Sequence, residues 1–384
     1  MAGLFLSGRR SKYAELFKIR VEPGESERFR AGSGPLSGYG EKEGKMGDRA
    51  QLMVLKNGRY DIHFDHWGAL SLPGYLFWGP KTALAYFKNN EKIEEWLDDV
   101  WAEGAALLDL DLRNLLFFGG EDLNCDVRLR EEFLSLMLVM WPGWEIRWAA
   151  EGQADIADYL GYPRENVLSL RDRSETTRDR LVSLLAEQAQ MEEEKEDYVN
   201  ICLSFKAADG RLKFFRISKL NVSDLMSGGP ELAAVCREAK GWPELHLDCF
   251  PCGGVHLDEG RRTVEYWLAE AWAPPLAAIE ADWESFEVIW LRDDYRRQLS
   301  LGEGLLSFQS LSRERRHELL RPIACLEQAE VTHDRKWLAT LIGRLGLQGT
   351  VTVSPSIFSS RPPKLPSPAA RHKKFDEIAA RSRG

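Results

Sequence analysis

Residues 104–121 read GAALLDLDLRNLLFFGGE, and residues 253–270, which lie 149 positions later, read GGVHLDEGRRTVEYWLAE. The two stretches align without a gap and share an Asp at the sixth position, an Arg at the tenth and a Glu at the last. In each stretch the Asp and the Arg flank a short turn between two apolar segments, which is the pattern of a β-hairpin. The same hairpin is therefore predicted twice in one chain.

Three further landmarks occur in the same order in both halves of the chain. They pair 57–59 (Asn-Gly-Arg) with 209–211 (Asp-Gly-Arg), 79–80 with 229–230 (both Gly-Pro), and 141–148 (WPGWEIRW) with 283–290 (WESFEVIW). Several landmarks that recur in one order indicate an internal repeat. We expect an α+β fold formed by internal duplication of a mixed, mainly antiparallel sheet with helices packed on it. The two copies are expected to meet through Trp-rich faces.

The composition changes along the chain and predicts its organisation. We expect a disordered extension at 1–45, a first repeat at 46–172, an acidic helical connector at 173–197 and a second repeat at 198–296. Residues 297–353 are expected to be helical with a candidate edge strand, and the Pro-rich, basic tail 354–384 to be disordered. Within the first repeat, helices are predicted at 81–89, 93–101 and 128–140.

The overall composition narrows the class of protein. The 384 residues are 44% hydrophobic and 29% charged, with a formal net charge of -9, which is ordinary for a soluble globular protein. An acidic main body offers no basic face for nucleic acid, and no apolar run approaches the roughly 20 residues of a membrane helix. The six scattered cysteines fit reduced thiols better than a disulfide scaffold. We therefore expect a cytoplasmic protein that binds neither membranes nor, through its main body, nucleic acid.

Comparison of the two copies separates fold determinants from candidate site residues. Of the shared residues at the hairpin turns, Asp109 and Asp258 are expected to cap backbone groups, and Arg113 and Arg262 to cover apolar surface. The first copy gathers polar and aromatic residues at the ends of its predicted elements, where sites are often built. The candidates are His66, Glu103, Glu121 and Asp122 for general acid–base catalysis, and Trp67, Trp78 and Trp101 for binding. The alternative is structural, with Glu121 and Asp122 capping the next helix and His66 bonding a backbone carbonyl.

The second copy contains a compact group of zinc-ligand residue types. These are His246, Cys249, Cys252 and His256, with the spacing His-x2-Cys-x2-Cys-x3-His. The alternative is a loop without a metal, or a redox pair of cysteines, because the duplication places His256 inside a strand. Zinc is therefore the one cofactor that the sequence suggests, and an unliganded loop is the favoured reading.

The sequence contains no phosphate-binding loop, nucleotide-binding fingerprint, nucleophile elbow or His-Glu-x-x-His motif. The first hypothesis is therefore a non-catalytic binding or interaction protein, of the kind that inhibitors and immunity proteins represent. Its acidic body would suit a basic protein partner. The alternative is a hydrolase-like enzyme with an acid–base site in the first repeat. The two hypotheses differ in space, because an enzyme needs His66, Glu103, Glu121 and Asp122 to converge on one cleft.

Overall fold

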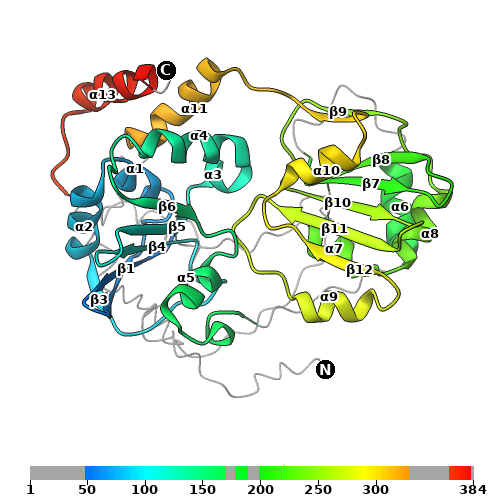
Figure 1. Cartoon of the computed structure of the whole chain (residues 1–384), viewed down its shortest axis with the longest axis horizontal. Helices are drawn as coiled ribbons and strands as arrows, with labels where there is room; N and C mark the ends of the chain where they lie inside the picture. Colours follow the sequence, from blue (N-terminus) through cyan, green and yellow to red (C-terminus); the bar gives the residue numbers. More distant parts are fainter. Residues whose placement is uncertain (1–47, 170–177, 189–198, 219, 328–362, 382–384) are drawn as a thin grey trace, which may run out of the picture.

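The computed structural model of the protein describes residues 48–169, 178–188, 199–218, 220–327 and 363–381. Two β-sheets lie side by side (Figure 1). The strands of the first sheet are β1 (Ala50–Lys56), β2 (Arg59–Asp65), β3 (Glu91–Ile93), β4 (Gly104–Asp109), β5 (Asn114–Phe118) and β6 (Glu145–Trp148). Those of the second are β7 (Ile201–Lys206), β8 (Leu212–Ile217), β10 (Gly253–Asp258), β11 (Thr263–Leu268) and β12 (Glu287–Trp290).

The second sheet repeats the topology of the first. The strand order is β3-β2-β1-β4-β5-β6 in the first sheet and β12-β11-β10-β7-β8 in the second, so that β3 is the one addition. In each sheet two antiparallel hairpins are joined by a parallel pair, β1 with β4 and β7 with β10. The last strand, β6 or β12, is also added in parallel. The sheets are mixed, and the predicted duplication is confirmed.

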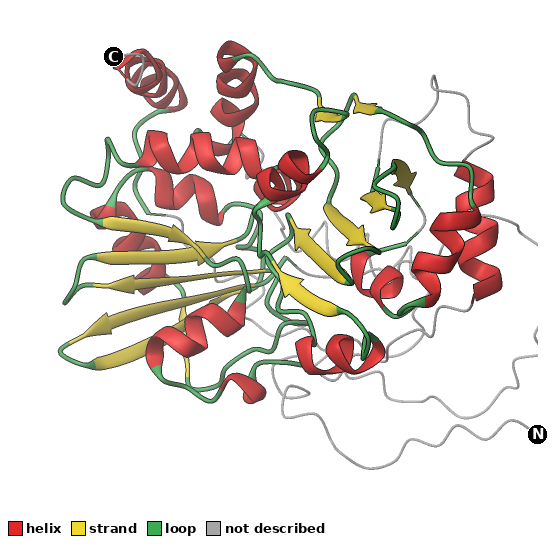
Figure 2. Ribbon diagram, turned by 45° about the vertical axis from the view of Figure 1, so that its right-hand side comes forward, coloured by secondary structure: helices red, strands yellow, loops and turns green. Residues whose placement is uncertain are grey.

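Helices cover both faces of the first sheet (Figure 2). One face carries α1 (Leu72–Phe77), α2 (Pro80–Asn89), α4 (Val127–Met137), α11 (Arg313–Ala324) and α13 (Pro368–Arg381). The other face carries α5 (Gln153–Leu160), next to the short helix η2 (Arg164–Asn166). The helix α3 (Glu121–Cys125) follows β5 directly and precedes α4.

The second sheet is covered in a comparable way. One face carries α6 (Arg178–Gln188), α7 (Val222–Met226), α8 (Glu231–Glu238) and α9 (Leu276–Asp282). The other packs against α10 (Tyr295–Leu301) and a small parallel sheet of β9 (Leu245–Leu247) and β13 (Leu306–Phe308). The helix predicted as a connector therefore belongs to the core of the second repeat, because Leu181, Leu184 and Leu185 are buried there. None of the described helices is both long and apolar enough to cross a bilayer.

Buried tryptophans make the same contact in both repeats. The indole Nε1 of Trp141 donates to the carbonyl of Leu76 at 2.9 Å, and that of Trp283 donates to the carbonyl of Met226 at 2.8 Å. Each contact ties the segment before the last strand to the helix that follows the first hairpin of the same repeat, α1 or α7. A buried indole that has both its apolar body and its N–H satisfied fixes the packing of its surroundings. These tryptophans are therefore fold determinants.

The paired hairpin residues also have the same role in both repeats. The carboxylate of Asp109 accepts from the backbone N–H groups of Asp111 and Leu112, and that of Asp258 accepts from Arg261. Arg113 and Arg262 both have a φ of 57°, which places them in the left-handed region. The predicted capping of the turns by the two aspartates is confirmed, and the left-handed conformation is a further role of the two arginines.

Three sequence predictions differ from the structure or fall outside it. Residues 93–101 form no helix, because Ile93 ends the edge strand β3 and Asp98 accepts from the N–H groups of Val100 and Trp101 in a local turn. The tail prediction is wrong for 363–381, because Phe375 and Ile378 of α13 are buried in the core of the first repeat. The predictions for 1–45, for the acidic run 192–197 and for 328–353 lie outside the described residues.

Charged residues as well as tryptophans join the two repeats. Arg130 is buried and donates to the carbonyl of Ala269 at 2.8 Å and to the Asp293 carboxylate at 2.6 Å. On the other side of the junction, Glu151 accepts from the indole of Trp290 at 2.9 Å. The repeats are thus held by directional polar bonds in addition to apolar packing, and these bonds fix the orientation of one repeat relative to the other.

Candidate ligand-binding site between the repeats

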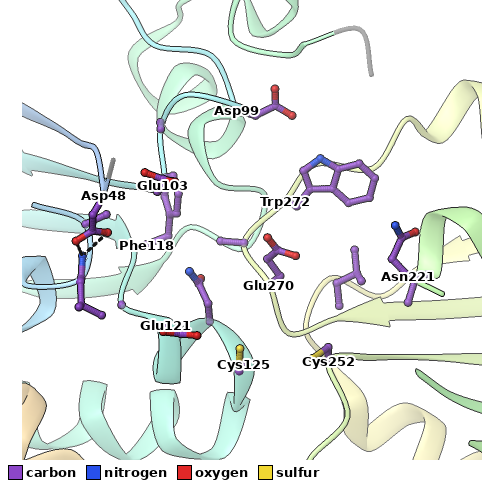
Figure 3. Close-up of a pocket in the computed structure, with 18 of the residues that line it drawn as sticks. Asp48, Asp99, Glu103, Phe118, Glu121, Cys125, Asn221, Cys252, Glu270 and Trp272 are labelled. Atoms are coloured by element: carbon purple, nitrogen blue, oxygen red, sulfur yellow. Dashed lines mark hydrogen bonds between the residues drawn. The ribbon is translucent and has the colours of Figure 1, made fainter. Parts of the chain in front are cut away.

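A cavity of about 510 Å³ lies where the two repeats face each other (Figure 3). The first repeat contributes the segment before β4, the end of β5 and helix α3, and the second contributes the segments before β10 and after β11 and the start of α7. Five carboxyl side chains line it. They are Asp48, Asp99, Glu103 and Glu121 from the first repeat and Glu270 from the second. Further polar or aromatic lining comes from Asn124, Asn200, Asn221, Cys125, Cys252 and Trp272.

Equivalent positions of the two repeats meet in this cavity. Glu121 and Glu270 are the last residues of the two aligned hairpin stretches, and both line it. Glu103 and Cys252 each immediately precede the first residue of those stretches, and both line it as well. The duplication therefore brings corresponding strand ends of the two sheets together, and the first repeat supplies four of the five carboxyl groups.

Asp48 is the lining carboxyl group with the most perturbed titration. Its two carboxylate oxygens accept from the N–H of Leu70 at 3.0 and 2.8 Å, which favours the ionised form. Burial outweighs this bond and, together with the negative charge of Glu103, raises the pKa of Asp48 to about 6. A carboxyl group of this kind exchanges its proton close to neutral pH, as acid–base groups in active sites do.

Glu103 is held in place by its neighbours. Its carboxylate accepts from the backbone N–H of Arg49 at 2.8 Å, and the Arg49 Nε lies 3.6 Å away. The Arg49 guanidinium in turn lies over the ring of Trp101, 4.4 Å from its centroid. Trp101 is thus a support for Arg49 and Glu103 and does not itself line the cavity.

Glu121 is placed by an unusual stretch of backbone. It begins α3 directly after Gly120, which has a φ of 80° and would carry a Cβ only 2.8 Å from the ring of Pro73. Only glycine fits this close approach without strain. Asp122, the next residue of α3, is exposed and does not line the cavity.

Two thiols from different repeats face the same cavity. Cys125 ends α3 and Cys252 precedes β10, and both appear at the cavity wall in Figure 3. A hydrogen bond between the two thiols, with burial as a further cause, raises the pKa of Cys125. The Cys125 thiol is therefore neutral at physiological pH and adds no charge to the site.

The structure brings some of the sequence candidates together and leaves others apart. Glu103 and Glu121 converge on the cavity, whereas His66 is buried with its ring edge-on to Phe64 and Trp67. Trp78 is also buried and donates its indole N–H to the carbonyl of Ala324 at 2.8 Å. His66, Trp67, Trp78 and Asp122 do not line the cavity. A catalytic group of His66, Glu103, Glu121 and Asp122 is therefore not assembled.

The four candidate zinc ligands have separate environments. His256 is buried inside β10, where its Nδ1 lies 2.8 Å from the hydroxyl of Ser204 and burial lowers its pKa to about 4. His246 lies on β9 with its ring at 2.5 Å from the Ser307 hydroxyl, Cys249 is partly buried against the apolar cluster that includes Leu245, and Cys252 faces the cavity. Within the described parts of the chain, no group of three or more His, Cys, Asp or Glu residues is placed to hold a metal ion. These side chains form no zinc site.

Sequence reasoning missed Asp48, Asp99, Glu270 and Trp272. Asp48 precedes the first strand by two residues, at the border of a stretch read as disordered. Glu270 and Trp272 belong to the second repeat, and the site was expected in the first repeat alone. The matched end of the two hairpin stretches, Glu121 with Glu270, was the signal in the sequence that could have located the shared cavity.

No protein-family model, curated protein or solved structure matches this chain. The charge and shape of the cavity are therefore the guide to what it binds.

Proposed function

We propose that the cavity between the repeats binds a small cationic organic molecule. The observation that carries this proposal is the lining itself, which has five carboxyl side chains and, among the described residues, no Lys, Arg or His. Such a site favours a positive ligand, because each carboxylate about 4 Å from a cation contributes about 1 kcal/mol in a wet environment and more where water is excluded. Trp272 adds an aromatic face that suits an ammonium or guanidinium group.

The neutral lining groups fit the same type of ligand. The side-chain carbonyls of Asn124, Asn200 and Asn221 can accept hydrogen bonds from an ammonium group. A volume of about 510 Å³ is within the range of small-molecule sites. The protein would thus be a binding protein whose recognition element is made by its duplication.

Isothermal titration calorimetry with three butyl compounds tests this proposal. Butylammonium is expected to bind, whereas butanol and butyrate are expected not to, and added salt is expected to weaken binding. The variants Glu121→Gln and Glu270→Gln should each weaken butylammonium binding about 5- to 30-fold. Asp122→Asn is the matched control, since it removes an exposed carboxylate next to Glu121 outside the cavity. Equal binding of all three compounds, or an equal effect of Asp122→Asn, would overturn the proposal.

A hydrolase-like activity at the same site is the second candidate. The raised pKa of Asp48 favours it, because a carboxylate that titrates near pH 6 can accept a proton from water and return it to a leaving group. A cationic chromogenic substrate such as lysine p-nitroanilide provides the assay. Turnover should rise with pH through an inflection near 6 and be lost in Asp48→Asn with substrate binding retained. Absence of turnover by the native chain would remove this candidate and leave the binding proposal standing.

A basic protein partner remains a proposal of the same electrostatic kind. A Lys or Arg side chain of such a partner could enter the acidic cavity in place of a free ligand. Capture of the full chain's partners from a lysate, with Glu121→Gln/Glu270→Gln as the comparison, tests this. A stoichiometric basic partner that the double variant fails to retain would support an inhibitor- or immunity-like role.

A further inference from the structure

A second cavity adjoins the acidic one. It has a volume of about 370 Å³, and six residues line both cavities. They are Asp99, Asn221, Val222, Leu268, Glu270 and Trp272. Because the two cavities share these residues, they are neighbours. Figure 3 shows Trp272 on the side of the acidic cavity where Asp99 and Asn221 lie.

The second cavity differs from the first in chemistry. The part that it does not share is walled mainly by apolar residues, which are Leu168, Ala273, Pro274, Pro275 and Ala278, with polar side chains from Ser169, Ser223 and Asp224. Ala273 and Pro274 are themselves buried, so this wall is fixed by packing. A charged space thus opens into a mainly apolar one, with Trp272 between them.

The apolar wall exists because the two repeats differ after their hairpins. In the first repeat the chain continues directly into α3, whereas in the second Pro274 and Pro275 delay the next helix until Leu276. Proline restricts the preceding residue to extended conformations, so this segment cannot continue as a helix. The backbone N–H of Trp272 donates to the carbonyl of Ala150 at 3.1 Å and fastens the segment to the first repeat.

We propose that the ligand of this site is an amphiphilic cation, which places its ammonium or guanidinium group among the carboxylates and its apolar tail against Trp272, Pro274 and Pro275. This inference rests on the proposed cation-binding function and adds the class of ligand. A small inorganic cation would leave the apolar cavity unused. A purely apolar ligand would bring no positive charge to the five carboxyl groups of the acidic cavity.

A homologous series of alkylammonium ions, from ethyl to octyl, tests the inference by calorimetry on the full chain. Each methylene that enters the apolar cavity should tighten binding about three- to fourfold, until the cavity is full and the affinity levels off. The corresponding alcohols should bind more weakly at every length. Affinity that does not depend on chain length would overturn the amphiphilic ligand while leaving cation binding intact. Absence of binding by any alkylammonium ion would overturn both.

Two variants, measured with the same series of alkylammonium ions, locate the tail within the protein. Ala278→Phe places a large side chain into the apolar cavity and should abolish the gain from longer tails, with ethylammonium binding unchanged. Ala277→Phe is the matched control, because Ala277 is its exposed neighbour on α9 and lines neither cavity. Trp272→Ala should reduce the gain per methylene as well. An unchanged chain-length series in both Ala278→Phe and Trp272→Ala would show that the tail lies elsewhere and overturn the inference.

Discussion

The two repeats build their cores with the same contacts, but the chain continues differently after the second hairpin of each repeat. Trp141 and Trp283 make one equivalent hydrogen bond in each repeat. After the hairpins, however, the first repeat forms α3 and the second forms a segment with two prolines and Trp272. Because these two segments face each other at the cavity, the divergence between the copies is located where a ligand would bind. Most common residues make the fold, whereas the cavity is lined by one shared pair, Glu121 and Glu270, and by residues that differ between the copies.

The largest effect is expected from the tryptophans that the repeats share. Trp141→Ala and Trp283→Ala should each lower the free energy of unfolding by about 3–5 kcal/mol, because each creates a large cavity and leaves a carbonyl without its indole donor. Urea unfolding followed by circular dichroism measures both. Leu112→Ala, at a side chain that is 71% exposed, is the control and should change little. A cost below 1 kcal/mol for either tryptophan would show that the two copies are not equivalent in their cores.

The buried ion pair between the repeats should have the next largest effect. Arg130→Met removes a donor to Ala269 and Asp293 and should cost about 2–4 kcal/mol, because it leaves a buried carbonyl and a partly buried carboxylate without a partner. Arg296→Met breaks the pair with Glu131, whose two side chains are 57% and 43% exposed, and should cost less than about 1 kcal/mol. Both values come from the same unfolding measurement. Equal costs would mean that burial of Arg130 does not decide the strength of the junction.

Local patterns were sufficient to predict most of the sheet structure and part of the site. Asn57 and Gly58, the Asn-Gly pair of the first landmark, have φ values of 52° and 67°, as a tight hairpin turn requires. Glu103 and Glu121 were selected because they stand at element ends, and both line the cavity. His66 was selected for the same reason but is buried, because the direction of a side chain at a strand end depends on register, which composition does not reveal.

Contacts between distant segments account for what the sequence could not predict. Phe375 of α13 packs with its ring centroid 5.7 Å from that of Phe77, although about three quarters of the chain lies between them. The Pro-rich residues before α13 dominate the local composition and conceal its apolar face. Trp272 is a similar case, since its place beside the first repeat's carboxylates follows from a hydrogen bond to Ala150 and from no local motif.

Asp48 should have a smaller effect on the free energy of unfolding, and only the first repeat has a carboxyl group at this position. Gly104 and Gly253 donate their N–H groups to the carbonyls of Arg49 and Asn200, so the counterpart of Asp48 is Val199. The folded-state pKa of Asp48, about 6, lies above the ordinary value of 3.8, so the folded protein binds this proton more tightly than the unfolded chain does. This group therefore favours folding below about pH 4 and loses that contribution as pH rises to 6.

Asp48→Asn should remove this pH dependence. Relative to the native chain, the variant is expected to gain about 2 kcal/mol of unfolding free energy between pH 4 and pH 7, since the amide oxygen can still accept from Leu70 and carries no charge. Urea unfolding at a series of pH values gives the difference. Asp122→Asn, on an exposed carboxylate, should run parallel to the native chain. A constant difference between Asp48→Asn and the native chain across this range would contradict the raised pKa.

The smallest effect should distinguish two residues that look identical in the repeats. Arg113 and Arg262 share a φ of 57°, and glycine adopts that conformation with less strain, so Arg113→Gly should raise the free energy of unfolding by about 0.5 kcal/mol. The guanidinium of Arg262 also lies 5.8 Å from the centroid of the Phe286 ring, a contact that glycine would lose. Arg262→Gly should therefore gain less or nothing. A larger gain at Arg262 than at Arg113 would mean that backbone strain, and not the side-chain contact, separates the two turns.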